Sequence, residues 1–557
     1  MRTKIVGIFV CMLMIATAIP AVTSVKISTI NATVPSIAPT SMGLVWAERQ
    51  KLLASDGGTL DEFGHSVSLD GDTVLIGAPA NSDNGAWTGS AYVFTRTGTT
   101  WTQQQKLLPS DSAGDDTFGL CVSLDGDTAL IGSGWDDNEN GVDAGSTYVF
   151  IRTGTTWTQQ AKLLASDGAT KDSFGASVAL SGDTALIGAV FDDDNGVDAG
   201  SAYVFTRTGI TWTQQAKLLA SDGAAGDQFS YYTCSLSGDT ALISAPFDDD
   251  MGTDSGSTYV FTRTGITWTQ QAKLLASDGS AGDVFGISFS LYDGTAIIGA
   301  SYDDDKGTDS GSAYVYTRTG TTWTQQAKLL ASDGAAGDHF GCFTSFSGET
   351  AIIGAFGDDD NGADSGSAYV FIRYGTTWTQ QQKILASDGA AGDHFGGYGF
   401  SLDGDTAIIS ARYDDDNGAD SGSAYVFTKR ENQPPATPTI TGPAKGKVGT
   451  ATEYNFTATD PDGDKVYYFI DWGDTTNSSW IGPYSSGEKI TQSHTWSEKG
   501  TFTIKAKAKD IYGNESDWGT LSVTMPLSYE SPHFRFFEWL FERFPHAFPI
   551  LRDLLGY

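Results

Sequence analysis

Runs of three aspartates recur along the chain and are its residues best suited to chemistry. In five places a fourth aspartate follows four residues after the run. Carboxylate oxygens are the ligands that Ca²⁺ prefers, and Ca²⁺ accepts about six to eight oxygens in flexible geometry. The pattern therefore predicts Ca²⁺ as a cofactor. The candidate metal ligands are Asp192, Asp194, Asp198, Asp248, Asp250, Asp254, Asp303, Asp305, Asp309, Asp358, Asp360, Asp364, Asp414, Asp416 and Asp420.

The spacing of these runs differs from that of an EF-hand calcium loop. When Gly418 is aligned with the glycine of such a loop, Tyr413 stands at the first position, where a carboxylate is expected. The residue equivalent to Asn417 is Met251 or Lys306 in other runs. Asp and Asn also bind loop backbone in solvated Asx-turns. Calcium sites and solvated acidic turns are both open from the sequence.

The aspartate runs belong to a sequence unit that repeats seven times. Two markers recur every 55 or 56 residues. They are Phe63, Phe118, Phe174, Phe229, Phe285, Phe340 and Phe395, and Trp46, Trp101, Trp157, Trp212, Trp268, Trp323 and Trp378. Each unit has four short β-rich runs separated by Gly/Asp turns, which in the last copy are 378–386, 395–402, 406–411 and 423–428. One unit is therefore expected to form one four-stranded meander.

Seven meanders predict an all-β fold built on a seven-bladed β-propeller over residues 46–430, because ring closure leaves few strand edges exposed. Alternate connections of a meander lie at the same end. The Ser-Asp-Gly loop after the tryptophan run, which is 387–389 in the last unit, should therefore share one rim of the ring with the aspartate run of the same unit. In the last unit this rim would hold Asp388, Asp393, the run 414–416 and Asp420. So many like charges must repel or share a cation.

The units also carry Phe-Gly near the second run and Gly-Ala near the end of the third, as in Phe174-Gly175 with Gly188-Ala189. This pattern resembles the FG-GAP repeat of integrin α-subunit propellers and of microbial secreted proteins. The resemblance implies a propeller and an extracellular binding role. In integrin-type repeats a calcium loop lies between the two motifs, but here only a tight turn such as 125–127 stands there. The calcium site of the family therefore does not transfer to this chain.

A Pro-rich linker at 431–439 separates the repeats from a second domain at 440–526. Its markers are Asp460-Pro461-Asp462-Gly463-Asp464, Asp471-Trp472-Gly473-Asp474 and His494-Thr495-Trp496. They resemble those of a PKD domain, which implies an immunoglobulin-like β-sandwich acting as a spacer or a weak adhesion module. Alternating strands such as 467–471 and 501–508 also favour a sandwich.

The two ends of the chain have compositions typical of export and attachment. Residues 1–25 read as a secretory signal peptide and 26–45 as a linker. The mature chain is expected to have no transmembrane segment. The tail at 527–557 is rich in aromatic residues and is similar to tails of secreted archaeal proteins, which implies docking to the envelope or to sorting machinery. The alternative is a helix that docks on the preceding domain.

Charge and composition narrow the function further. The net charge of −35 argues against nucleic acid as a partner, because a phosphate backbone requires a basic surface. The histidines fit no zinc spacing or triad, and the Cys and His departures from the repeat are scattered along the chain. We assign no catalytic residue and expect no enzyme. The prediction is a secreted, cell-surface adhesion protein that binds an extracellular protein or carbohydrate, with a structural envelope component as the alternative.

Overall fold

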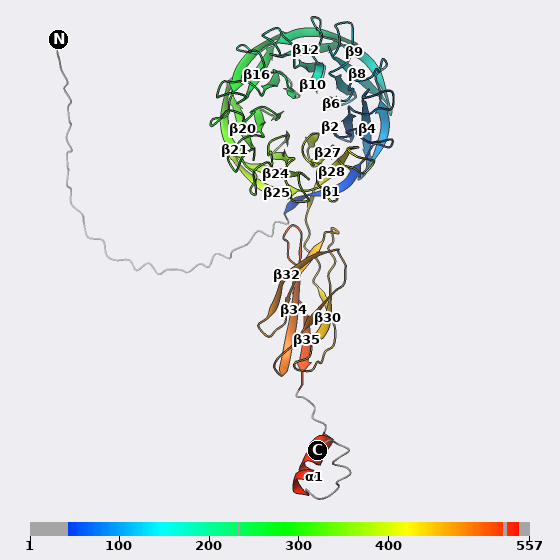
Figure 1. Ribbon diagram of the computed structural model, residues 1–557, viewed down its shortest axis with the longest axis vertical. Helices are drawn as coiled ribbons and strands as arrows, with labels where there is room; N and C mark the ends of the chain where they lie inside the picture. Colours follow the sequence, from blue (N-terminus) through cyan, green and yellow to red (C-terminus); the bar gives the residue numbers. More distant parts are fainter. Residues whose placement is uncertain (1–42, 232, 527–531, 545–557) are drawn as a thin grey trace, which may run out of the picture. The chain divides into compact units, whose positions relative to one another are not determined.

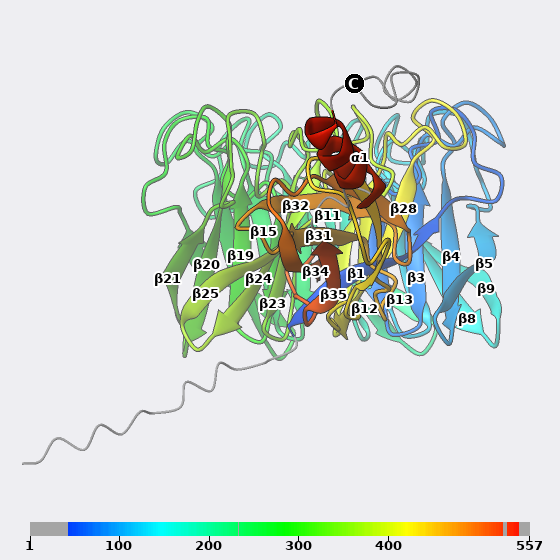
Figure 2. The same ribbon diagram turned by 90° about the horizontal axis from the view of Figure 1, so that it is seen from below.

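The computed structural model describes residues 43–231, 233–526 and 532–544. Seven four-stranded antiparallel sheets stand around a ring, with one short inner strand of each sheet nearest the axis (Figure 1). The strands run between two rims of this ring (Figure 2). The predicted all-β fold, a seven-bladed propeller followed by a sandwich, is confirmed. The predicted signal peptide and most of the linker 26–45 lie outside the described residues.

The second and third strands of the blades keep nearly the same lengths around the ring, whereas the inner strand varies from four residues in β6 to eight in β10. Their bounds, blade by blade, are β2 Ser66–Asp70, β3 Thr73–Ala78, β4 Ser90–Thr97, β5 Thr100–Leu107; β6 Val122–Asp125, β7 Thr128–Ser133, β8 Ser146–Thr153, β9 Thr156–Leu163; β10 Phe174–Ser181, β11 Thr184–Ala189, β12 Ser201–Thr208, β13 Thr211–Leu218; β14 Cys234–Ser237, β15 Thr240–Ala245, β16 Ser257–Thr264, β17 Thr267–Leu274; β18 Phe289–Tyr292, β19 Thr295–Ala300, β20 Ser312–Thr319, β21 Thr322–Leu329; β22 Thr344–Ser347, β23 Thr350–Ala355, β24 Ser367–Tyr374, β25 Thr377–Ile384; and β26 Phe400–Asp403, β27 Thr406–Ala411, β28 Ser423–Glu431 with β1 Leu44–Leu52.

The blades are offset from the sequence repeats by one strand, which corrects the prediction that one repeat forms one meander. The tryptophan strand of each repeat is the outer strand of the preceding blade, as β5 with Trp101 pairs with β4. The first such strand, β1, pairs with β28 from the other end of the repeats. The physical reason is that a hairpin joins each fourth run to the tryptophan run that follows it. The ring is therefore closed by strands from both ends of the propeller sequence.

The two glycines of the Phe-Gly and Gly-Ala motifs meet between neighbouring blades. A Cβ on Gly77 of β3 would lie 2.0 Å from the carbonyl oxygen of Gly119, which belongs to the Phe-Gly of the next repeat. Gly119 itself has φ of +97°. Only glycine permits this backbone approach. The motif is thus an inter-blade contact, and its phenylalanine is core: Phe63 is fully buried and packs edge-to-face on Tyr92 and Phe94.

The apolar cores lie between adjacent blades. One cluster combines Leu130 and Val149 of one sheet with Ile187 and Tyr203 of the next. The strands that face neighbours on both sides, such as β11, are buried along their whole length, as expected for strands covered on both faces. The repeated tryptophans and Tyr-Val-Phe runs supply core rather than an exposed platform, in agreement with the packing expected of large aromatic residues.

The second domain is a two-sheet sandwich, as predicted. One sheet contains β29 Thr439–Thr441, β30 Thr452–Thr457 and β33 Ile490–His494, and the other contains β32 Asn477–Tyr484, β31 Val466–Asp471, β34 Gly500–Asp510 and β35 Gly519–Met525. Its core includes Trp472 and Trp496. Within the predicted tail, α1 spans Pro532–Arg543 and exposes Phe536 and Trp539. No helix in the described ranges is long and apolar enough to cross a membrane.

Candidate functional site

Each blade holds a cluster of aspartates around one lysine, at the rim where the aspartate runs lie. In one blade Lys217 of β13 reaches three carboxylates. Its Nζ lies 2.7 Å from an oxygen of Asp192 and 2.6 Å from one of Asp194, both in the aspartate run, and 3.0 Å from one of Asp167 in the Ser-Asp-Gly loop. The two loops therefore share one rim, as predicted, and their charges share a cation supplied by the chain.

The same cluster recurs around the ring. The lysines are Lys51, Lys106, Lys162, Lys217, Lys273, Lys328 and Lys383. Five blades have three carboxylates around the lysine. In the blade of Lys106, Asn81 replaces the first aspartate of the run, and in the blade of Lys162, Asn138 replaces the third. The asparagines show that the cluster accepts an uncharged amide at either position.

In each cluster the lysine ammonium packs over the ring of a tyrosine. In the blade of Lys273, the Tyr259 hydroxyl lies 2.9 Å from an oxygen of Asp248 and 2.9 Å from one of Asp222, and can donate its one proton to either. The lysine ammonium lies 5.1 Å from the tyrosine ring centroid. Asp248 is only 3% exposed. A buried carboxylate is costly unless it is paired and hydrogen-bonded. The tyrosine and lysine supply these partners to the buried Asp248.

The remaining aspartates of each run shape the loop. The Asp194 N–H donates to Asp192 Oδ1, and the Asp198 N–H donates to Asp193 Oδ1 over 2.8 Å. These are the Asx-turns considered as the alternative to metal binding. Asp198 has φ of +54° and makes no ion pair to Lys217. The structure thus brings together the first and third aspartates of each run, whereas Asp198, Asp254, Asp309, Asp364 and Asp420 occupy equivalent turn positions outside the lysine cluster.

Two members of the cluster were missing from the predicted site. They are the lysine and the aspartate of the Ser-Asp-Gly loop, exemplified by Lys383 and Asp333. The signal in the sequence was a lysine five residues after each of the seven repeated tryptophans, in a chain with few cations. The sequence does not show that this lysine pairs with the aspartates, because Lys383 belongs to the repeat that follows the one with Asp333 and Asp358.

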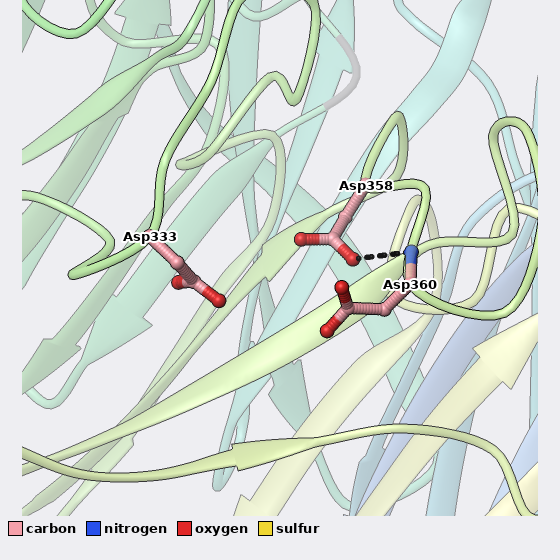
Figure 3. Close-up of side chains that lie close together, drawn as sticks. All are labelled: Asp333, Asp358 and Asp360. Carbon is pink, nitrogen blue, oxygen red and sulfur yellow. Dashed lines mark hydrogen bonds between the residues drawn. The ribbon is translucent and has the colours of Figure 1, made fainter.

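The carboxylates of one cluster lie close enough to hold a metal ion. Asp333, Asp358 and Asp360 each offer an oxygen within 4.8 Å of the others, and they point toward one another (Figure 3). The Lys383 ammonium, however, lies 2.6–3.0 Å from the same three side chains. A calcium ion between these oxygens would have to displace it.

The lysine and the carboxylates stabilise each other's charged forms. Burial alone would lower the pKa of Lys217, but its hydrogen bonds to Asp192 and Asp194 raise that pKa above its ordinary value. Burial opposes ionisation of Asp167, yet the hydrogen bond and charge of Lys217 lower the pKa of that carboxyl. Lys217 and Asp167 are therefore both ionised at neutral pH.

A separate buried aspartate in each blade has the opposite behaviour. Burial, and then the charge of neighbouring aspartates, raises the pKa to about 6 in Asp116, Asp172, Asp283 and Asp393. The Asp172 carboxylate accepts from the Ala169 N–H over 2.7 Å. Because the folded state holds these protons more tightly than the unfolded state does, ionisation destabilises the fold as pH rises from about 4 to 6.

We therefore expect the melting temperature to rise by a few °C when pH is lowered from 7 to 5. Below about pH 4 the trend should reverse, because carboxylates with lowered pKa, such as Asp167, then lose their pairing with lysine. Circular dichroism melts from pH 3.5 to 7.5 measure this. A variant with Asp172→Asn and Asp283→Asn should show a weaker rise between pH 7 and 5. A melting temperature that increases from pH 5 to 7 would contradict the assignment.

A second acidic cluster lies in the sandwich domain. Asp460, Asp462 and Asp464 also offer oxygens within 4.8 Å of one another. The Asp460 Oδ1 accepts from the backbone N–H groups of Asp462 and Asp464. The Arg430 guanidinium, at the end of β28, lies 2.7 Å from both Asp462 and Asp464. Here too a side-chain cation of the protein lies against the carboxylates.

Comparison with known families agrees with this architecture. A family profile described as "FG-GAP repeat" matches residues 46–94, 101–150, 157–205, 212–261, 268–316, 323–371 and 378–427. No curated protein matches the chain.

Solved structures are similar to each part separately. The PKD domain of an M14-like peptidase from a Thermoplasmatales archaeon is 55% identical, covering 17% of this chain and 99% of its own, with a TM-score of 0.17. The PKD domain of the human VPS10 domain-containing receptor SorCS2 is 19% identical over 18% of this chain and 80% of its own, with a TM-score of 0.14. An α-L-arabinofuranosidase from Clostridium thermocellum is 10% identical over 61% of this chain and 97% of its own, with a TM-score of 0.26.

Proposed function

Because the chain belongs to the FG-GAP repeat family, whose members are typically extracellular, we propose that it is an exported cell-surface adhesion protein that binds through its aspartate rim. The observation that carries this proposal is the charge left over in each cluster. In five blades three carboxylates share one ammonium, so two negative charges remain. Asp167 and Asp194 are half exposed. The rim thus offers a ring of fixed, solvent-accessible carboxylates.

A repeated array of this kind suits a partner with repeated cationic groups, either an extracellular protein or a carbohydrate. Each contact between exposed charges contributes less than about 1 kcal/mol. Several simultaneous contacts on one rigid ring raise the total affinity without any single strong site. The proposal also includes a non-enzymatic role, because carboxylates held in ion pairs with lysine are poor proton donors and acceptors at neutral pH.

Calcium is the alternative cation for this rim. Its binding would require Lys217 and the equivalent lysines to withdraw from their carboxylates, which the hydrogen bonds to aspartate and the packing on tyrosine oppose. We therefore propose that the ring folds and binds without calcium at these clusters.

The adhesion proposal can be tested with beads that carry the full mature chain, held under flow on chitosan, a cationic polysaccharide. Replacing Asp194, Asp250, Asp305, Asp360 and Asp416 by Asn removes five charges from the rim. Asn138 already occupies this position in one blade, so the fold should tolerate the change. We expect bead retention to fall several-fold, and added salt to have the same effect by screening.

The matched control removes five charges from the opposite rim. There Asp72, Asp127, Asp183, Asp239 and Asp405 lie in the tight turns, and Gly294 stands at the equivalent position in another blade. These Asp→Asn changes should leave retention nearly unchanged. An equal loss of bead retention in both variants would show that the net charge of the protein, and not the aspartate rim, holds the beads. No retention of the wild type, together with self-assembly in solution, would favour the structural envelope role instead.

A further inference from the structure

Positions that differ between the seven otherwise similar repeats gather at the axis of the ring. The residue after the Phe-Gly motif, or its equivalent, differs in every copy: His65, Leu120, Ala176, Tyr231, Ile287, Cys342 and Gly397. The residue after the second strand of each blade also varies: Pro79, Gly134, Val190, Pro246, Ser301, Phe356 and Arg412. By contrast, the outer Thr-Trp-Thr-Gln-Gln run is the same in all repeats but the first. Three of the Cys and His departures that look scattered in the sequence, His65, Cys121 and Cys342, therefore line one cavity.

Ten of these residues line a cavity of about 330 Å³, to which all seven blades contribute. Seven identical large side chains could not converge on one axis, so some variation is a steric requirement. The variation does not fill the space, however. Small residues such as Ala176 and Gly397 lie in the lining with Tyr302, Phe343 and Phe356. The result is an open, asymmetric cavity with aromatic walls, which is the usual character of a small-molecule site.

The aromatic side chains form a connected wall. Tyr302 packs edge-to-face on His339, which stacks on Phe356 with 4.6 Å between ring centroids. Tyr398 contacts Phe343 and His65, at 6.0 Å and 5.6 Å between centroids. Ring faces of this kind receive the apolar face of a flat or cyclic ligand.

The cavity has one charged group in its lining. Arg412 lies with its guanidinium carbon 3.7 Å from the Tyr398 ring centroid and 4.5 Å from that of Tyr413. Its Nη2 also contacts the Tyr413 hydroxyl. Its Nε is buried and has no hydrogen-bond partner in the described chain, and its nearest carboxylate, Glu62, is 3.8 Å from Nη1. No aspartate or glutamate is among the described residues that line the cavity.

Among the described residues that line the cavity, no second cation accompanies Arg412. Burial, and then the charge of Arg412, lowers the pKa of His65 to about 3, so this histidine is neutral at pH 7. Its Nδ1 lies 3.0 Å from the carbonyl oxygen of Leu120, to which a neutral imidazole donates. A guanidinium held against aromatic rings, in a lining without carboxylates, is complementary to an anion.

We propose that this axial cavity binds a small ring-bearing carboxylate, with Arg412 pairing the carboxylate and the wall of Tyr302, Phe356 and Tyr398 packing against the ring. The site is separate from the aspartate rim and does not depend on the adhesion role. The ring could belong to a sugar acid or to an aromatic acid, which share this chemistry. Arg412 is here a binding residue, and no reaction is assigned.

The test titrates the full mature chain with D-glucuronate and with benzoate, followed by calorimetry and saturation-transfer NMR. D-glucose and benzyl alcohol are the uncharged counterparts. We expect one acid to bind about tenfold or more tightly than its counterpart, because the buried guanidinium pairs only with the anion. Preference for glucuronate would indicate a sugar acid, and preference for benzoate an aromatic acid.

Two variants separate binding from folding. Arg412→Gln should weaken the preferred acid about tenfold or more while leaving its uncharged counterpart unchanged. Ile287→Trp keeps the charge but fills the cavity, and should weaken both ligands. Arg263→Gln, at an exposed pair with Asp239, is the control and should bind like the wild type. Failure of both acids to bind, equal binding of acid and counterpart, or unchanged binding by a folded Arg412→Gln variant would overturn the proposal.

Discussion

Deleting residues 43–52 is expected to prevent the propeller from closing and to convert the chain into an aggregating species. These residues contain β1, whose register on β28 runs from Leu44 against Glu431 to Leu52 against Ala424. Without β1, strand β28 presents its unpaired backbone as an open edge, which pairs readily with other chains. The deletion also exposes the core around Trp46, which is 1% exposed. Size-exclusion chromatography with light scattering should show a larger and less uniform species than the parent protein gives.

Point variants of β1 make the same prediction quantitative. Trp46→Ala should destabilise the ring by about 3–5 kcal/mol, the usual cost of removing a buried tryptophan. Leu44, in the same strand, is 43% exposed, so Leu44→Ala should change stability by less than about 0.5 kcal/mol. Urea unfolding of the two variants measures the difference. Equal effects, or a monomeric and cooperatively folding deletion variant, would show that ring closure does not depend on β1.

Lys217→Met is expected to destabilise its blade strongly and to make the protein responsive to calcium. The substitution leaves Asp192 buried with its charge uncompensated beside Asp167 and Asp194. Breaking a fully buried ion pair costs about 3–5 kcal/mol, and partial exposure of two of the carboxylates reduces the expected cost to about 2–4 kcal/mol. The matched control is Arg207→Met, whose partner Asp183 is 69% exposed, with an expected cost below about 1 kcal/mol.

Thermal melts of wild type and Lys217→Met in EDTA and in calcium complete the experiment. A ligand that binds only the folded state raises its stability by mass action. We expect the variant to gain more from calcium than the wild type does, because the emptied cluster then offers oxygens without a competing ammonium. A large, calcium-specific rise in the wild type would show instead that the ion displaces lysine and would restore calcium as the cofactor of the rim. No gain in the variant would show that these loops do not form a metal site even without lysine.

Several features of this protein followed from residue types and their period. A phenylalanine that recurs seven times, at the spacing of Phe63 and Phe118, predicts the blades. The loop before the second run of each repeat and the loop after its third run place the aspartates at one rim. Such inferences depend on local backbone preference and on the alternation of strand direction, which short segments carry within themselves. Calcium binding, adhesion and export remain predictions, because their partners are not part of the chain.

The tertiary structure decided which groups meet. A periodic sequence has no intrinsic start, so only strand pairing shows that β1 closes the ring on β28, with Lys51 reaching Asp414 from the opposite end of the repeats. Likewise, His65 and Arg412 converge on one cavity only because the ring brings its first and last blades together. Local patterns determined the strands and the acidic loops. Contacts between separate repeats determined which lysine pairs with each acidic loop and which residues line the cavity at the axis.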